Sequence, residues 1–200
     1  RLPALLGYSV EENLKPKALW LSQVGLSNDQ IPKVIASKPQ LFGYSLQEKM
    51  KPTVQWLLDI GVGQDKIAKA IANKPSLLGY SLQEKMKPTA RWLSDIGMDD
   101  LQIASAISKH PSLLGYSLEQ NIMPTVQALL DQGLTQPQIT TMLVSFPPLL
   151  GYSSKRLMHR MSILSAQGLL STSLCGAMAL TDAKFAARFQ YNESCGAHVY

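Results

Sequence analysis

Apolar side chains along this chain follow the spacing of helices. Between residues 46 and 58 they recur at Leu46, Met50, Val54, Leu57 and Leu58, and this spacing of three and four residues places them on one stripe of a helix. A shorter helical stretch, residues 65–71, follows after a glycine-containing turn. The chain lacks the alternation of apolar and polar residues that is typical of strands. The pattern therefore predicts pairs of helices, a longer one and then a shorter one.

This pattern repeats every 36 residues. The tripeptide Gly-Tyr-Ser marks the period five times, and two series of prolines keep the same step: Gly7, Gly43, Gly79, Gly115 and Gly151; Pro3, Pro39, Pro75, Pro111 and Pro147; Pro16, Pro52, Pro88 and Pro124. A fixed period of this length is typical of stacked helical repeats, in which each repeat buries its apolar face against its neighbours. We expect one elongated all-α domain over residues 1–190, a curved solenoid of four full repeats and a degenerate fifth, with residues 191–200 frayed.

The ends of the helices carry recognisable signals. Ser45 with Glu48 predicts a capping box at the start of a first helix, and the same pairing recurs as Ser9 with Glu12, Ser81 with Glu84, and Ser117 with Gln120. Gly61 is expected to end that helix in the left-handed conformation, as are Gly25, Gly97 and Gly133. Pro52 lies inside the first helix, where we expect a kink or a fresh helix start.

Two aromatic columns also keep the period. Tryptophan follows each of the first three inner prolines, and tyrosine follows each marker glycine: Trp20, Trp56 and Trp92; Tyr8, Tyr44, Tyr80, Tyr116 and Tyr152. A large residue repeated at one place is more often packed between repeats than used for stacking on bases, so we expect both columns to be buried there. Stacking on a base stays the alternative for the tryptophans.

Composition and motifs argue against catalysis and against a bound cofactor. Residues 43–53 and 79–89 read identically, whereas a catalytic centre needs a few unlike groups that converge on one spot. Cys195 and His198 are spaced like two zinc ligands, but Cys175 is remote and a fourth ligand is not evident, so we expect no metal. Two cysteines do not make a disulfide framework, which favours a reducing compartment. Because no apolar run approaches 18 residues, no membrane span is expected.

The basic side chains suggest where a polyanion would bind. The chain carries 19 Lys and Arg against 14 Asp and Glu, a net charge of +5, which is a mild excess that suits a polyanion. Six residues are candidate phosphate contacts, three in a column before the inner prolines and three at the start of the fifth repeat: Lys15, Lys51 and Lys87; Lys155, Arg156 and Arg160. In the second group, cations at a helix N-terminus oppose its dipole, and a bound anion would relieve that. Cations at second-helix ends, Lys38, Lys74 and His110, are expected to serve the helix dipole instead.

The repeat as a whole resembles that of the mitochondrial transcription termination factor (mTERF) family. The resemblance rests on Pro-x-Leu-Leu-Gly-Tyr-Ser-Leu, then Met-Lys-Pro, Trp-Leu, a glycine and an Ile-rich second helix, and on the closing Leu180 to Phe185 with Arg188 and Phe189. It implies an all-α superhelix of helix pairs with short 3₁₀ turns, whose concave side holds nucleic acid. It also implies action in mitochondria or chloroplasts, on transcription, RNA processing or ribosome assembly.

Together these observations predict a non-enzymatic, monomeric nucleic-acid-binding protein. Double-stranded DNA is the leading ligand, bound through phosphates, with a role in organellar transcription or its termination. The alternatives are RNA, or a protein partner held in the groove of a scaffold for RNA processing or ribosome assembly. Because the chain begins at Arg1 in mid-repeat without an initiator Met, we expect it to be a fragment or a processed product.

Overall fold

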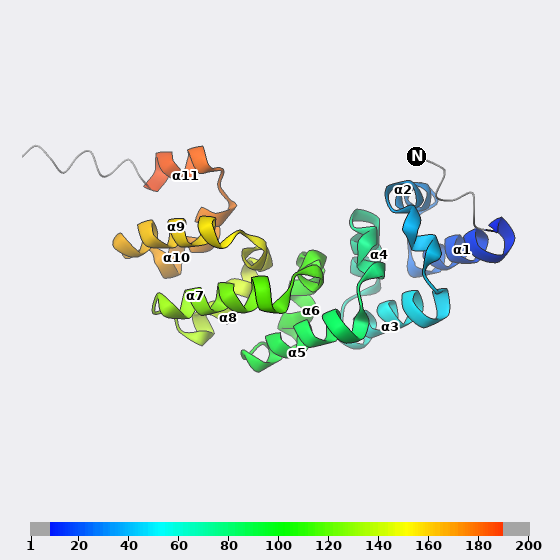
Figure 1. Cartoon of the computed structure of the whole chain (residues 1–200), viewed down its shortest axis with the longest axis horizontal. Helices are drawn as coiled ribbons and strands as arrows, with labels where there is room; N and C mark the ends of the chain where they lie inside the picture. The colour runs from blue at the N-terminus through cyan, green and yellow to red at the C-terminus, as the bar shows by residue number, and fades with distance from the viewer. Residues whose placement is uncertain (1–8, 190–200) are drawn as a thin grey trace, which may run out of the picture. The chain divides into compact units, whose positions relative to one another are not determined.

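The computed structural model describes residues 9–189, and these residues form helices and turns without a strand (Figure 1). This confirms the predicted all-α repeat. The α-helices are α1 (Lys15–Val24), α2 (Gln30–Ser37), α3 (Lys51–Asp59), α4 (Gln64–Asn73), α5 (Lys87–Asp95), α6 (Asp100–Lys109), α7 (Met123–Asp131), α8 (Gln136–Ser145), α9 (Ser154–Ala166), α10 (Leu170–Ala179) and α11 (Asp182–Phe189).

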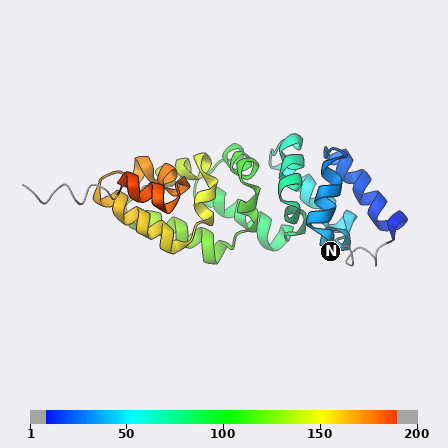
Figure 2. The ribbon, with the colours of Figure 1, turned by 90° about the horizontal axis from the view of Figure 1, so that it is seen from above.

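Each repeat consists of a first helix, a second helix and a short 3₁₀ turn that leads to the next repeat. The 3₁₀ turns begin at the outer prolines and end at the marker glycines: Pro39–Gly43, Pro75–Gly79, Pro111–Gly115 and Pro147–Gly151. The chain divides into two compact units, Arg1–Gly115 and Tyr116–Tyr200. Unit 1 holds α1 to α6 and unit 2 holds α7 to α11. Within each unit the helices of successive repeats follow one another in chain order (Figure 2).

Serine side chains begin the first helices, but only the serine half of each predicted capping box forms at the four predicted starts, and the Ser117 N–H donates to Asn121 instead of Gln120. The hydroxyl oxygen of Ser9, Ser45, Ser81 and Ser117 accepts a hydrogen bond of 3.1 Å from the backbone N–H three residues on, which satisfies one of the donors that a helix start leaves free. A complete capping box, with bonds in both directions, forms at the second helices between Asp99 and Gln102 and between Thr135 and Gln138.

The inner prolines are accommodated by a wide turn. Four first helices open with one π turn directly before α1, α3, α5 and α7: Val10–Leu14, Leu46–Met50, Leu82–Met86 and Leu118–Ile122. The proline ring would clash with the carbonyl four residues back in a regular helix, and the wider turn avoids that clash. In the fifth repeat Arg160 takes the place of the proline, and α9 runs as an uninterrupted α-helix. The kink expected at Pro52 thus takes the form of a π turn.

Glycines end the first helices in the left-handed region. Gly25, Gly61, Gly97 and Gly133 have φ of +113°, +87°, +92° and +81°, a conformation that side-chain-bearing residues rarely adopt. The sequence-based prediction of these four helix ends is confirmed. Gly168, which arrives one residue early in the fifth repeat, has φ of +68° and does the same after α9.

The tyrosine column packs against the marker glycine of the next repeat. A Cβ atom at Gly79 would lie 2.9 Å from the ring of Tyr44, at Gly115 2.3 Å from the Tyr80 hydroxyl, and at Gly151 2.2 Å from the Tyr116 hydroxyl. The expected packing between repeats is therefore confirmed for these tyrosines, but their side chains are half-buried and do not belong to the core. Tyr8 lies outside the described residues.

The tryptophan column is buried unevenly. Trp20 is 8% exposed and belongs to the core, as predicted, whereas Trp56 and Trp92 are only half-buried. The tightest core positions are instead aliphatic side chains that face neighbouring helices, such as Leu57, Ile67, Leu77 and Leu93. Trp56 and Trp92 thus keep part of their surface accessible, which the expectation of a buried column did not foresee.

Candidate nucleic-acid interface

The lysine column lies at the first position of the first helices of unit 1. Lys15, Lys51 and Lys87 begin α1, α3 and α5, next to the prolines, and all three side chains are exposed. Because the prolines fix the turn before each helix, the three lysines take the same place in their repeats. They remain candidate phosphate contacts.

The three lysines differ in their immediate partners. Lys15 forms an ion pair of 2.5 Å with Glu11, one turn earlier. Lys51 donates to the amide oxygen of Gln47 at 3.1 Å, and an amide leaves the charge of the ammonium uncompensated. Among the described residues no carboxylate comes within 4.0 Å of Lys51 or Lys87. Lys51 and Lys87 therefore offer more free positive charge than Lys15.

Two grooves in unit 1 join the lysine column to the tryptophan column. The first, of about 620 Å³, is lined by Trp20 of the first repeat and by Lys51, Gln55 and Gln64 of the second. The second, of about 230 Å³, is lined by Trp56 of the second repeat and by residues of the third: Lys87, Ala90, Arg91, Ser94, Asp100 and Ile103. In both grooves, therefore, a lysine of one repeat lies with the tryptophan of the preceding repeat.

Sequence reasoning missed Arg91 as a candidate. Arg91 lies one turn after Lys87 on α5, is exposed, and lines the same groove. The repeats before and after it have Leu19, Gln55 and Gln127 at this place. A single cation in an otherwise uncharged column was the signal that could have singled it out.

Arg160 is not a phosphate contact, and here the prediction is wrong. Its side chain is 1% exposed, and its guanidinium donates to the carbonyl oxygens of Ala177 and Leu180 and to the carboxylate of Asp182 at 2.5 Å. The guanidinium also lies 4.6 Å from the ring centroid of Phe185. The anion that relieves the positive charge here is a carboxylate of the same chain.

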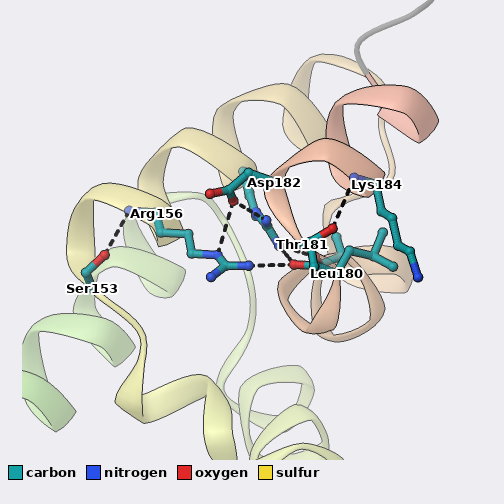
Figure 3. A network of polar contacts seen from close by, with 8 residues as sticks. Ser153, Arg156, Leu180, Thr181, Asp182 and Lys184 are labelled. Carbon is teal, nitrogen blue, oxygen red and sulfur yellow. Dashed lines mark hydrogen bonds and ion pairs between the residues drawn. The ribbon is translucent and has the colours of Figure 1, made fainter.

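Arg156 belongs to the same cluster (Figure 3). It donates to the Leu180 carbonyl at 2.5 Å, its Nε lies 3.6 Å from a carboxylate oxygen of Asp182, and its guanidinium lies 5.2 Å from the ring centroid of Tyr152. These contacts join α9 to the start of α11. Because the Arg156 guanidinium already has these partners, it is not a free cation. Lys155 is exposed beside it on the first turn of α9 and stays a candidate.

Lys74, one of the cations at the second-helix ends, has a partner in the next repeat. Lys74, after α4, donates to the hydroxyl of Ser112 in the next repeat at 2.7 Å. His110 takes the same place after α6, and burial, together with the positive charge of Lys74, lowers its pKa. The Lys74 side chain thus links two successive repeats.

Lys17 is a second buried cation that the sequence did not reveal. It is 5% exposed and donates to the Phe42 carbonyl at 2.5 Å and to Asn13 at 2.9 Å, and burial lowers its pKa. Its column continues with the buried Thr53, Thr89 and Thr125. Comparison of these columns could have indicated an inward-facing position.

Other kinds of site find little support in the part of the chain described. Residues 9–189 contain no group of three or more His, Cys, Asp or Glu side chains placed to hold a metal ion, and Cys195 with His198 lies outside this range. Burial raises the pKa of the Cys175 thiol. No helix of residues 9–189 has the length and apolarity needed to cross a bilayer.

The stacked helix pairs, joined by 3₁₀ turns at a constant period, define a helical-repeat protein. The chain belongs to the mTERF family, whose family model matches residues 1–186. This confirms the resemblance seen in the repeat. No curated protein matches the chain. Family membership implies a non-enzymatic helical-repeat protein that binds nucleic acid, and proteins of this family are typically organellar.

Proposed function

We propose that the chain binds double-stranded DNA through its phosphates and thereby regulates organellar transcription or its termination. Lys51 and Lys87 are the principal contacts in this proposal. Lys15 contributes less because Glu11 neutralises it, and Lys155 adds a contact in unit 2. The observation that carries the proposal is the pair of exposed ammonium groups at equivalent places in successive repeats, with no carboxylate of the described chain beside them.

The physical basis is the release of counterions from the nucleic acid. A cation that replaces a condensed counterion at a phosphate gains free energy whatever the base sequence. Lysine suits this role because its ammonium acts as a point charge on a flexible stem. A regular row of such charges favours a ligand whose phosphates are themselves regularly spaced, and a duplex has that property.

Binding to labelled nucleic acids tests this proposal. Fluorescence anisotropy at low salt would compare duplex DNA with single-stranded RNA of the same sequence, for the parent and for the double variant Lys51→Gln/Lys87→Gln. The matched control is Lys33→Gln/Lys69→Gln, which removes the same charge from exposed positions on α2 and α4. We expect duplex DNA to bind more tightly than the RNA, and the first variant to lose much more affinity than the control.

Three other outcomes would contradict the proposal. Equal losses in the two double variants would show that net charge alone matters. Tighter binding of the RNA would make RNA the ligand. Binding of neither nucleic acid would leave a protein partner as the ligand of this surface.

A further inference from the structure

We propose that the groove lined by Trp56, Lys87 and Arg91 binds one unpaired nucleotide, with the base on Trp56 and the phosphate on the two cations. The inference rests on the proposed function, since it assumes a nucleic acid as ligand. It goes further by assigning a site for a base, which contacts to phosphates alone do not require.

The groove has an apolar wall and a cationic rim. Trp56 and Ile60 of the second repeat and Ala90 and Ile103 of the third supply apolar surface, and the tryptophan ring is half-buried. An aromatic ring that keeps part of its face open is a platform for any base, because every base has a π-face. Such stacking changes affinity by roughly 5- to 150-fold per base.

The two cations lie one turn apart on α5 and have no carboxylate partner within 4.0 Å among the described residues. Like charges at this spacing on a helix repel each other. A phosphate held by both would remove that repulsion, and Arg91 can donate two hydrogen bonds to it. Asp100 also lines the groove but lies in the first turn of α6, where the helix dipole favours a negative charge.

The preceding groove provides an internal comparison. It has the same tryptophan and lysine columns, but Gln55 stands where the third repeat has Arg91, and Trp20 is 8% exposed. The Trp20 side chain is thus buried in the core, and this groove lacks a cation at the place of Arg91. The structure therefore favours the Trp56 groove over the Trp20 groove as the site for a base.

The experiment compares oligothymidylate with an abasic deoxyribose-phosphate oligomer of equal length. Affinity and intrinsic tryptophan fluorescence are measured for the parent, Trp56→Leu, Trp56→Phe and Arg91→Gln, with Lys69→Gln as the charge-matched control. In the parent, oligothymidylate should bind roughly 5- to 150-fold more tightly than the abasic oligomer and quench the fluorescence. Trp56→Leu should bring this ratio close to one. Trp56→Phe keeps an aromatic ring and should retain much of the ratio while the quenching is largely lost.

Arg91→Gln should weaken oligothymidylate binding more than Lys69→Gln does, and this exposed substitution keeps the test valid if Trp56→Leu does not fold. A ratio near one in the parent, or a ratio that the Trp56→Leu variant leaves unchanged, overturns the inference. So does a loss of oligothymidylate affinity in Arg91→Gln that is no greater than the loss in Lys69→Gln. If duplex DNA is still bound in that case, the proposed function stands. If the parent protein binds neither oligothymidylate, nor the abasic oligomer, nor duplex DNA, both the inference and the proposed function are overturned.

Discussion

The side chain of Tyr80 occupies the space that a side chain at Gly115 would need. A Cβ atom built at Gly115 lies 2.3 Å from the tyrosine hydroxyl oxygen and 2.5 Å from the ring carbon that bears it. The glycine lets the backbone of the 3₁₀ turn approach the tyrosine of the preceding repeat, and the tyrosine fills the space thus left. The same contact joins Tyr44 to Gly79 and Tyr116 to Gly151, which explains in physical terms why glycine and tyrosine recur together in these repeats.

Gly115→Ala should destabilise the protein. The added methyl group forces the Tyr80 ring or the turn to move, and overpacking of this kind costs about 1–3 kcal/mol. Denaturant unfolding followed by circular dichroism measures the change. The control is Gly176→Ala on α10, where a Cβ meets no atom within 4 Å and where alanine should stabilise the helix by up to about 1 kcal/mol.

A double variant separates the steric cause from other effects. Tyr80→Ala removes the ring, so in the combined variant the methyl group at position 115 meets no tyrosine. The two changes should then be non-additive, with Gly115→Ala costing much less in the Tyr80→Ala background. Full additivity would show that the glycine is needed for another reason.

The repeat itself was predictable from the sequence because local chemistry specifies it. Ser45 caps a helix start and Gly61 ends the helix, and both depend only on residues within a few positions. The uneven burial of the tryptophans was not predictable in this way. Trp20 and Trp56 have the same place in their repeats, so their position in the period does not distinguish the buried ring from the half-buried one.

Arg160→Gln should destabilise unit 2, whereas the same substitution at an exposed cation should have little effect on stability. The shorter amide cannot replace the bonds to the Ala177 and Leu180 carbonyls, and losing hydrogen bonds to a charged group costs about 1.5–3 kcal/mol. Asp182→Asn tests the ion pair alone. That change removes the carboxylate but keeps the carbonyl contacts of the buried guanidinium, so it should cost less than Arg160→Gln does. Equal costs in urea unfolding would mean that the ion pair, and not the carbonyl contacts, holds α11.

His110 should make the protein less stable in acid. Burial, together with the charge of Lys74, lowers its pKa in the folded state, so the unfolded state binds the proton more readily. Stability is therefore full above the unfolded pKa of about 6.5 and falls as the pH drops through the folded pKa. His110→Gln should lose less stability than the parent between about pH 7.5 and about pH 5. Parallel pH profiles of the unfolding free energy would argue against this role.

The binding site was only partly predictable, because long-range partners decide which cations are free. Lys51 and Lys87 were found from their period alone. Arg160 was misassigned because its partners Ala177 and Asp182 lie about a helix away in the chain, and the sequence does not reveal that α10 ends beside it. Arg91 departs from the repeat, so the period does not mark it as a candidate.

The salt dependence of duplex binding tests the central claim most directly. Each phosphate contact contributes about 0.9 to the slope of log affinity against log salt concentration. Lys51→Gln/Lys87→Gln should therefore lower the magnitude of the slope by about 1.8, whereas Lys33→Gln/Lys69→Gln should leave it close to that of the parent. An unchanged slope in the Lys51 and Lys87 variant would contradict the account, because it would mean that these two ammonium groups do not contact phosphates.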